Sequence, residues 1–597
     1  MGLLQKALET YDAMEQLAGI YVEGKEPLAP IGHIVTKAQI EVTIDTDGQF
    51  ISARAADKDR KIIIPVTEES SGRTSSPAAH PLCEQLGYLL GQDEIKFALY
   101  KHGLERWMQS EHRHSKAAAV LSYIRKATLR ENLTAAGIST EKEKDMVCWR
   151  IVGCGTDTSP AVWEDISLMK AYTAWYLSQQ QGEKQLCMLT GEDSTITWQH
   201  LKGTFSLNGN AKIISANDSA NFTYRGRFAE PGEAASVGYI ASQKAHNALK
   251  WLISTQGTIQ GNRAFVAWNP QGKRIPKPTL PLLSIADEAP ALPTYRNYRN
   301  DLRKKLAGYH AELEANDQVV IAAFDAATTG RLAITYYNEL LGSDFLERLA
   351  YWEESCCWAY NHRSISSPSL ASIIDFAFGT PRGTPESVKA DEAIVAEKMQ
   401  RLLSCCIDQA AFPLDIMRAL VTRTGNMQVY SEANRHKLLY TACAAIRKYH
   451  IDHKKEAFDL ALEPERKDRS YQWGRLLAVM ERIEETAYWN KAQQSDDGKT
   501  KERLTTAIRM QAAFIQRPGV ISALINERLH SAYYQDLRSI QRNYFDRLLS
   551  EIMVQIQASC EKQEDYGKPL TETYLPGYYL QKNTFYAKKS NEETEEE

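Results

Sequence analysis

Hydrophobic and polar positions follow two different periods along the chain. Over residues 31–66 apolar and polar residues alternate, and the turn 45–48 (DTDG) between β-branched runs predicts a hairpin. Over residues 82–136 apolar residues recur every three or four positions, which predicts helices. Further strands are predicted over residues 146–153 (MVCWRIVG), 187–191 (CMLTG), 210–217 (NAKIISAN) and 263–269 (RAFVAWN).

A second alternating stretch and a long helical remainder complete the pattern. Residues 318–341 alternate on both sides of a Thr-Thr-Gly turn, which predicts another hairpin, and nearly all later segments have helical spacing. The sequence thus predicts an α+β N-terminal part with mixed or antiparallel strands and helices, followed by an all-α C-terminal helical bundle. The predicted regions are an α+β region (1–345, with an internal boundary near 140–150), a helical linker region (346–470), a C-terminal helical bundle (471–587) and an acidic disordered tail (588–597).

Composition narrows the class of protein. The 597 residues include 71 Lys and Arg against 75 Asp and Glu, so this is not a globally basic nucleic-acid-binding chain. Any contact with nucleic acid must therefore come from local basic surfaces. The ten cysteines include no C-x-x-C pair, and no stretch is apolar and long enough to span a bilayer. We expect a cytoplasmic protein that contacts no membrane.

Catalytic motifs are missing from the sequence. It contains no H-E-x-x-H, G-x-S-x-G, G-x-G-x-x-G or Walker A pattern, which favours a binding protein over an enzyme and implies no catalytic residues, metal or cofactor. Two alternatives remain open. One is a helical scaffold that contacts only proteins. The other is a metal-dependent nuclease, whose ligands would come from His102, His112, His114, Cys148 and Cys154.

Basic residues are concentrated in a few stretches. Residues 96–130 contain eight Lys and Arg against two Glu, with Phe97, Tyr100, Trp107 and Tyr123 interleaved. Cations that neutralise phosphates and rings that stack on bases are typical of nucleic-acid interfaces, although a solvated helix with its rings in the core fits the same pattern. Further basic stretches cover residues 273–305, 435–455 and 503–547. Their spread along the chain favours an extended polyanion as the ligand.

Seven segments in order resemble one protein family, the large subunit of the subtype I-C CRISPR Cascade, an RNA-guided antiviral surveillance complex. They are LLQKALETYDAM (3–14), RTSSPAAHPLCEQLGYLLG (73–91), CMLTGE (187–192), AKIISANDSANFTYRG (211–226), VVIAAFDAATTGRLAITYY (319–337), SYQWGRLLAVMERIEETA (470–487) and LPGYYLQKNTF (575–585). The chain departs from the family pattern at Ser76, where the family has Gly, and at Glu84, where it has Asp.

The resemblance implies a non-catalytic subunit. Such a subunit recognises the motif that flanks the protospacer in duplex DNA, helps to unwind the duplex and holds the displaced strand for a recruited helicase-nuclease. It implies as further partners the guide RNA, the target DNA, the Cascade backbone subunits, the guide-processing subunit and a small subunit translated from within this gene. Met480 would start a product of residues 480–597, and Met510 is an alternative start.

Residue types within these segments suggest the contacts. A polar loop with Arg and hydroxyl groups can reach phosphates and base edges, and so can a polar loop after a strand. The predicted DNA-binding residues in region 1–345 are Arg73, Ser75, Ser76, Lys96, Lys101, Arg113, Lys116, Lys212, Ser215 and Asn217. The predicted contacts to the displaced strand are Arg503, Arg509, Arg528, Arg538 and Arg542.

Overall fold

The chain is divided into two compact units. The computed structural model describes residues 2–57, 60–73, 76–153, 159–180, 182, 184–205, 209–215, 228–283, 294–360, 364–493 and 504–592. Unit 1 comprises Met1–Ile275 and Asp317–Leu340, and unit 2 comprises Pro276–Asn316 and Leu341–Glu597. Helix α10 (Tyr295–Glu312), which falls inside the predicted region 1–345, therefore belongs to unit 2.

The first sheet of unit 1 has the strand order β3-β2-β6-β5. Strand β2 pairs antiparallel with β3, which confirms the predicted hairpin, and parallel with β6. A parallel neighbour requires a long crossover, and the predicted helical zone supplies it. Strand β6 is apolar along most of its length because it is buried on both faces. The elements are β2 (Ile40–Asp45), β3 (Phe50–Ala55), β5 (Glu84–Gln85), α3 (Leu86–Leu89), α4 (Glu94–Met108), α5 (Ser115–Ile124), α6 (Leu129–Ala135) and β6 (Met146–Val152).

A hydrophobic core lies between this sheet and the helices around it. Trp107 from α4, Tyr123 from α5 and Trp149 from β6 are all at most 1% exposed within it. The two-stranded antiparallel pair β1 (His33–Lys37) and β4 (Lys61–Pro65) and the helix α7 (Ile166–Gln179) pack against the same core. Helix α2 (Glu68–Gly72) follows β4.

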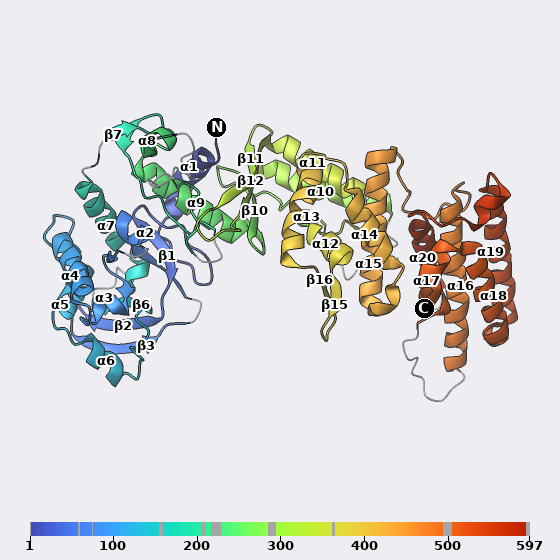
Figure 1. Ribbon diagram of the computed structural model, residues 1–597, viewed down its shortest axis with the longest axis horizontal. Helices are drawn as coiled ribbons and strands as arrows, with labels where there is room; N and C mark the ends of the chain where they lie inside the picture. Colours follow the sequence, from blue (N-terminus) through green and yellow to red (C-terminus); the bar gives the residue numbers. More distant parts are fainter. Residues whose placement is uncertain are drawn as a thin grey trace. The chain divides into compact units, whose positions relative to one another are not determined.

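The second sheet of unit 1 has the order β12-β11-β10-β9. Strands β11 and β12 are neighbours, as the predicted hairpin over residues 318–341 requires. Helices α1 and α9 lie beside the sheet and bury a second core, which includes Trp268 of β10 and Phe324 of β11 (Figure 1). The elements are α1 (Leu3–Ala13), α8 (Pro231–Ala234), α9 (Tyr239–Gln256), β9 (Thr258–Gln260), β10 (Arg263–Trp268), β11 (Gln318–Asp325) and β12 (Ala333–Leu341).

Two predicted strands of unit 1 are not strands. Residues 187–191 form the turn between β7 (Lys184–Leu186) and β8 (Asp193–Thr195), closed by a 2.8 Å hydrogen bond from Gly191 N to Cys187 O. Gly191 has a φ of +73°, which suits a turn rather than a strand. In the second segment, residues 210–217, only Lys212 among the described residues forms a β-bridge, and its partner is Arg331. Residues 216–217 lie outside the described residues.

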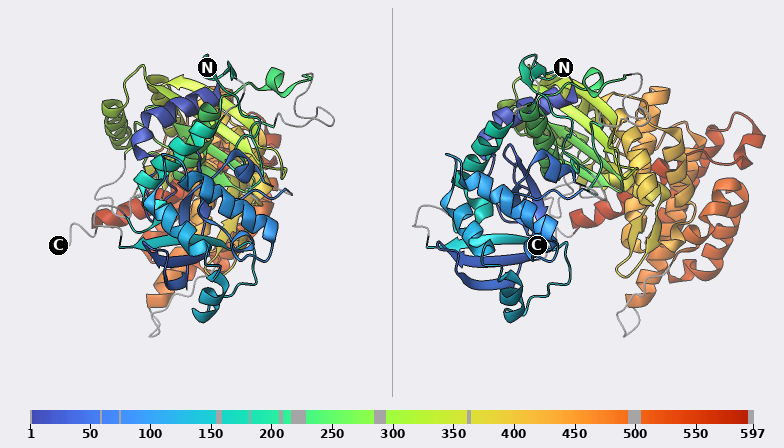
Figure 2. Two further views of the ribbon diagram at one scale, coloured as in Figure 1. Left: turned by 90° about the vertical axis from the view of Figure 1, so that its left-hand side faces the viewer. Right: turned by 60° about the vertical axis from the view of Figure 1, so that its left-hand side comes forward.

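Unit 2 is mostly helical, which confirms the predicted fold class. Figures 1 and 2 show its helices in yellow-green to red. Two short strand pairs, β13–β14 and β15–β16, interrupt them, and runs of three residues are too short to show a period in the sequence. The elements after α10 are α11 (Gly342–Ser355), β13 (Trp358–Tyr360), β14 (Ser364–Ser366), α12 (Leu370–Phe378), β15 (Thr380–Arg382), β16 (Ser387–Lys389), α13 (Glu392–Ile407), α14 (Leu414–Thr424), α15 (Glu432–Tyr449), α16 (Arg469–Gln493), α17 (Thr506–Gln516), α18 (Pro518–Ala532), α19 (Ser539–Ala558) and α20 (Tyr574–Glu592). Helix α20 thus continues into the segment predicted to be a disordered tail.

Helices α16 and α20 are in backbone contact through two glycines. A Cβ atom on Gly474 would lie 1.9 Å from the carbonyl oxygen of Tyr574, and one on Gly577 would lie 2.1 Å from that of Tyr471. Only glycine permits so close an approach. Beside this contact the buried Arg475 donates from Nε to Gln581 Oε1 at 3.0 Å. Two of the segments that resemble the Cascade family, 470–487 and 575–585, therefore pack against each other.

Candidate nucleic-acid interface

Arg73 at the start of the first predicted recognition loop is engaged within the protein. Its guanidinium donates two hydrogen bonds to the carboxylate of Glu84, at 2.5 and 2.7 Å, and a third to Ala78 O at 2.6 Å. It also lies over the ring of Tyr88, 4.6 Å from the centroid. Glu84 is fully buried and accepts further bonds from the backbone amides of His80 and Gln85. The Arg73–Glu84 pair fixes the ends of the loop, so a direct contact of Arg73 with a base would require this pair to open.

The tip of the same loop faces solvent. Ser76 is exposed, whereas Thr74 and Ser75 lie outside the described residues. Glu84, at which the sequence departs from the family pattern, is the residue that anchors the loop. Sequence reasoning identified the loop and named Arg73 as a DNA-binding residue; in this structure the Arg73 guanidinium is bonded to Glu84.

Two lysines bring the second predicted segment to this loop. Lys202 donates from Nζ to the backbone oxygen of Arg73 at 2.9 Å. Gly203, the residue after Lys202, donates from its backbone N to Ala211 O at 2.8 Å and so joins Lys202 to the second segment. Burial lowers the pKa of Lys202, and the charges of Lys212 and Arg73 lower it further. Burial also lowers the pKa of Lys212, against the attraction of Glu68. Within the described ranges neither ammonium group forms an ion pair, so an anion bound here would relieve their repulsion.

The second segment is only partly described. Lys212 exchanges backbone bonds with the β11–β12 turn, through Lys212 N to Gly330 O at 3.2 Å and Leu332 N to Lys212 O at 2.9 Å. Ser215 is half-buried, and Asn217 lies outside the described residues. Lys202 was missed by sequence reasoning because no motif marks it and only the fold brings it to Arg73.

A neutral polar layer lies beside these lysines. His200 and His246 are 2% and 1% exposed, and their rings stack with centroids 5.9 Å apart. Ser242 links them, through its Oγ to His200 Nδ1 at 2.9 Å and its backbone oxygen to His246 Nδ1 at 2.7 Å. Burial is the main cause that lowers the pKa of His200 to about 3 and that of His246 to about 4; the charge of Lys212 acts in the same direction on both, and His246 does so on His200. Both imidazoles are therefore neutral near pH 7.

Several polar atoms of this layer have no hydrogen-bond partner among the residues that the structure describes. They are His200 Nε2, Tyr239 OH, Gln243 Oε1 and His246 Nε2. The last three come from one face of α9, at positions four and three residues apart. Each buried polar atom left without a partner costs about 1–3 kcal/mol, so this layer is a place where water or another polar group would bind favourably.

The basic stretch on α4 and α5 is divided between surface and core. Arg113 is exposed and Lys101 half-buried, while Lys96 pairs with Asp93 at 3.1 Å. Lys116 is 1% exposed and forms an ion pair with the equally buried Asp165. Its Nζ also donates to Ser159 O at 2.5 Å. Lys116 therefore offers no exposed ammonium group to a phosphate, and its role in this structure is to hold α5 to the start of α7.

The aromatic residues of that stretch belong to the core. Tyr100, Trp107 and Tyr123 are at most 1% exposed. Tyr100 OH donates to Leu82 O at 2.7 Å, and Trp107 Nε1 donates to His112 O at 3.0 Å. Because their faces are covered, these rings cannot stack on bases. The alternative that they are core residues on the inner side of a solvated helix is confirmed.

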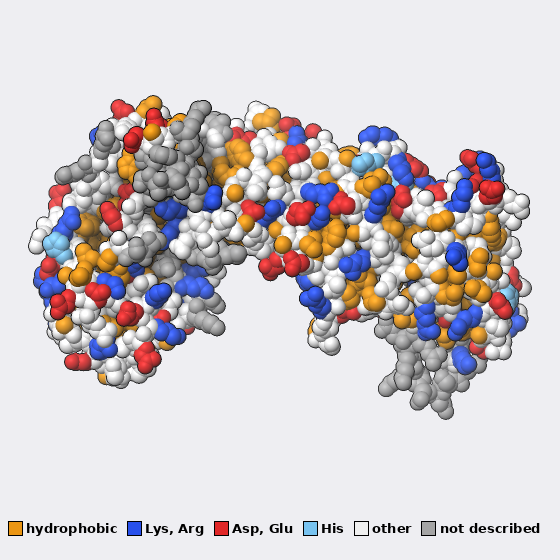
Figure 3. All heavy atoms as spheres, in the orientation of Figure 1, with side chains coloured by type: hydrophobic (Ala, Val, Ile, Leu, Met, Phe, Trp, Pro, Cys, Tyr) orange, Lys and Arg blue, Asp and Glu red, His pale blue; other side chains and the backbone are white. Residues whose placement is uncertain are grey.

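The predicted arginines of the C-terminal bundle lie at its surface. Arg509 on α17, Arg528 on α18 and Arg538 at the start of α19 are exposed. Arg542 is half-buried and donates from Nη2 to Gln535 O at 3.1 Å, and Arg503 lies outside the described residues. Figure 3 shows basic side chains beside apolar ones over these helices on the face in view. The exposed arginines can reach a phosphate without any rearrangement.

The residues suggested as nuclease ligands are placed differently from one another. Cys148 is fully buried in β6, where burial raises the pKa of its thiol well above the usual range. His114 Nδ1 accepts a bond from Lys116 N at 3.3 Å and so caps α5. Cys154 lies outside the described residues. Among the residues that the structure describes, no three His, Cys, Asp or Glu side chains converge as a metal site.

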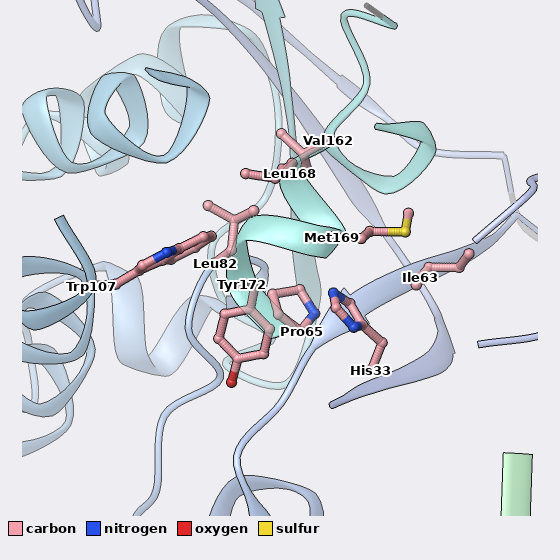
Figure 4. A pocket seen from close by; sticks show the side chains of 9 residues that line it. All are labelled: His33, Ile63, Pro65, Leu82, Trp107, Val162, Leu168, Met169 and Tyr172. Atoms are coloured by element: carbon pink, nitrogen blue, oxygen red, sulfur yellow. The ribbon is translucent and has the colours of Figure 1, made fainter. Parts of the chain in front are cut away.

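A small cavity in unit 1 is lined mainly by apolar side chains, including Trp107, Leu168 and Tyr172 (Figure 4). Its volume is about 10 Å³, which leaves room for about one water molecule. His33 on its wall is buried, which lowers its pKa to about 4. The cavity is too small for a nucleotide, so it does not serve as a base-binding pocket.

The chain is thus an α+β unit with clustered lysines and a helical unit with exposed arginines. In the described part of the chain, no helix has the length and apolar character that crossing a bilayer requires. A family model described as CRISPR-associated protein (Cas_Csd1) matches residues 8–586. The chain therefore belongs to this CRISPR-associated family, which confirms the predicted connection to Cascade-type defence proteins. No curated protein matches the sequence.

Proposed function

We propose that this chain is the non-catalytic large subunit of a subtype I-C Cascade complex in the cytoplasm. It recognises the protospacer-flanking motif in duplex DNA, helps to unwind the duplex and holds the displaced strand for a recruited helicase-nuclease. Its partners are the guide RNA and target DNA, the backbone and guide-processing subunits, and a small subunit from an internal start. The observation that carries the proposal is the meeting of the two predicted recognition segments at Lys202, within a chain of a CRISPR-associated family.

Each group at this position has a distinct task. Lys202 and Lys212 neutralise backbone phosphates and fix the register of the duplex. Ser76 at the exposed tip of the loop presents a hydroxyl group to base edges. Arg73 and Glu84 hold the loop in shape. The exposed arginines Arg509, Arg528 and Arg538 then neutralise phosphates of the displaced strand.

The test uses the assembled complex and two duplexes that differ only in the flanking motif. We expect Lys202→Ala and Lys212→Ala to weaken binding of both duplexes alike and to lower the salt slope by about one each. Ser76→Ala instead narrows the difference between the duplexes, by about 1–3 kcal/mol if it contacts a base. Lys25, an exposed lysine of unit 1, provides the control as Lys25→Ala. Unchanged binding in both lysine variants would contradict the proposal.

A further inference from the structure

Helix α10 in unit 2 buries only a narrow stripe of its surface. Its buried residues are Tyr298, Leu302 and Leu306, at 5%, 1% and 9% exposure and four residues apart. Tyr298 OH donates to Glu353 Oε2 at 2.9 Å, and Thr294 Oγ1 caps the first turn by accepting from Asn297 N. The stripe packs next to α11 (Figure 1). The remaining surface of a well-anchored helix is therefore left to solvent.

The exposed face of α10 is strongly basic. Arg296, Arg303, Lys304 and Lys305 are exposed, and Arg299 is 40% exposed, whereas the helix has only Asp301 and Glu312 as acidic residues. Arg299 pairs with Glu354 at 3.2 Å, and Lys304 with Asp301 at 3.4 Å. Arg296, Arg303 and Lys305 form no ion pair with any residue that the structure describes. Their charges are thus available to an external anion.

The cations are aligned along the helix. Arg296, Arg299 and Arg303 are three and four residues apart and so lie on one ridge, which extends about 10 Å at 1.5 Å per residue. Like charges at this spacing repel one another and weaken an isolated helix. A row of phosphates removes that repulsion along the whole ridge at once. The arrangement therefore suits a linear polyanion better than a single small anion.

Charge also separates the candidate occupants of this face. A protein partner normally requires apolar or aromatic side chains at the centre of its interface. The exposed large hydrophobic residues within the described ranges include none from α10. Contacts to a nucleic-acid backbone, by contrast, need cations and little else.

We propose that the exposed face of α10 binds the sugar–phosphate backbone of nucleic acid. This contact is separate from the motif-reading site of unit 1 and does not depend on the sequence of the nucleic acid. Through this face unit 2 contacts nucleic acid at a surface other than the one formed by the predicted arginines of the C-terminal bundle. Duplex DNA, a single DNA strand and RNA share the required phosphates, and the experiment distinguishes among them.

The test removes three charges without removing the helix. The full chain in its complex carries Arg296→Gln, Arg303→Gln and Lys305→Gln, since glutamine retains good helix propensity. The matched control carries Lys467→Gln, Lys491→Gln and Lys562→Gln, which removes three exposed charges elsewhere in unit 2. Labelled duplex DNA, single-stranded DNA and RNA of equal length and unrelated sequence are titrated across a salt series. Thermal melting of both variants reports on folding.

The triple α10 variant should bind at least one of the three polyanions more weakly than the control does. Its salt slope should fall by about two, because Arg296 and Arg303 lie on the ridge whereas Lys305, two residues after Arg303, lies on the opposite side of the helix. Arg296→Lys, Arg303→Lys and Lys305→Arg together should restore the binding. Equal binding of all three polyanions by the triple variant and the control would overturn the proposal. Loss of a partner subunit with unchanged binding would overturn it too, and would identify a protein-docking face.

The two proposals fail separately. Loss of the α10 contact leaves discrimination between correct and altered flanking motifs intact, because it acts on phosphates only. The Lys202 and Lys212 variants of unit 1 retain an intact α10, so they test the unit 1 site alone. The duplex comparison and the polyanion titration together therefore show which of the two contacts is absent.

Discussion

Arg73 and Glu84 form a bidentate ion pair that joins the two ends of a loop across eleven positions of sequence. Removal of one partner of a buried pair leaves an uncompensated charge and commonly costs about 3–5 kcal/mol. We expect Arg73→Ala to lower the free energy of unfolding by an amount in that range, because Glu84 is fully buried. Chemical denaturation measures the change, and Arg113→Ala, at an exposed arginine, serves as the control. A loss no larger than that of the control would show that the pair contributes little.

The same pair makes a prediction about DNA recognition. If Arg73 acts by shaping the loop, Glu84→Gln should reduce discrimination between flanking motifs as strongly as Arg73→Ala does. If Arg73 instead contacts a base directly, Glu84→Gln should leave discrimination largely intact. Binding of the two duplexes by both variants, under conditions in which each is folded, separates these roles.

Acid should destabilise unit 1 through the neutral histidines. The pKa of His246 is about 4 in the folded protein, below the ordinary value of 6.5, so between these values the unfolded chain binds more protons. Stability is then lost as the pH falls from about 6.5 to 4, by about 3 kcal/mol for this residue alone. Denaturation at a series of pH values should show a shallower decline for His246→Gln than for His102→Gln, a change at an exposed histidine. Parallel declines in both variants would contradict the prediction.

The lowered pKa of Lys212 predicts a pH dependence of DNA binding. Burial lowers the pKa of Lys212, so this lysine loses its positive charge at a lower pH than an ordinary lysine does. We expect affinity for duplex DNA to fall, as the pH rises, at a lower pH than the loss of charge from an ordinary lysine would cause. In Lys212→Arg the fall should be smaller, because arginine stays charged throughout. Equal pH profiles for the two proteins would place Lys212 outside the interface.

The helix contact at Gly474 predicts a specific steric effect. A methyl group on Gly474 would meet the Tyr574 carbonyl at 1.9 Å, so Gly474→Ala must separate α16 from α20. We expect a loss of about 1–3 kcal/mol or more in unfolding free energy. Gly308→Ala on α10 is the control, since nothing lies within 4 Å of its added Cβ, and helix propensity should make that change neutral or favourable. Thermal denaturation should show a lowered midpoint for Gly474→Ala and an unchanged or raised midpoint for Gly308→Ala.

Elements with a long, regular period could be predicted from sequence. Helices α4 and α5, strand β6 and the hairpin β2–β3 lie where apolar periodicity placed them. Residues 187–191 were mistaken for a strand because a short apolar run does not distinguish a strand from a turn closed by glycine. The strand pairs β13–β14 and β15–β16 are held by their surroundings rather than by a local pattern.

The candidate site was only partly predictable. Local composition identified the loop at Arg73 and the segment at Lys212, but not that Lys202 joins them, because that contact spans 129 positions of sequence. Composition also could not show that Lys116 is buried against Asp165 while Arg113 is exposed. Charge is read directly from a sequence, whereas the burial that decides its use depends on the tertiary fold.

The glycine contact between α16 and α20 bears on the proposed internal start. Gly474 and Tyr471 precede Met480 in α16, so a product that begins at Met480 keeps all of α20 but loses the backbone against which Gly577 packs. Tyr574 and Gly577 would be uncovered in that product. A small subunit made this way would therefore not be a detached copy of the bundle, and its last helix would expose a backbone surface at Tyr574 and Gly577 that an adjacent chain could cover.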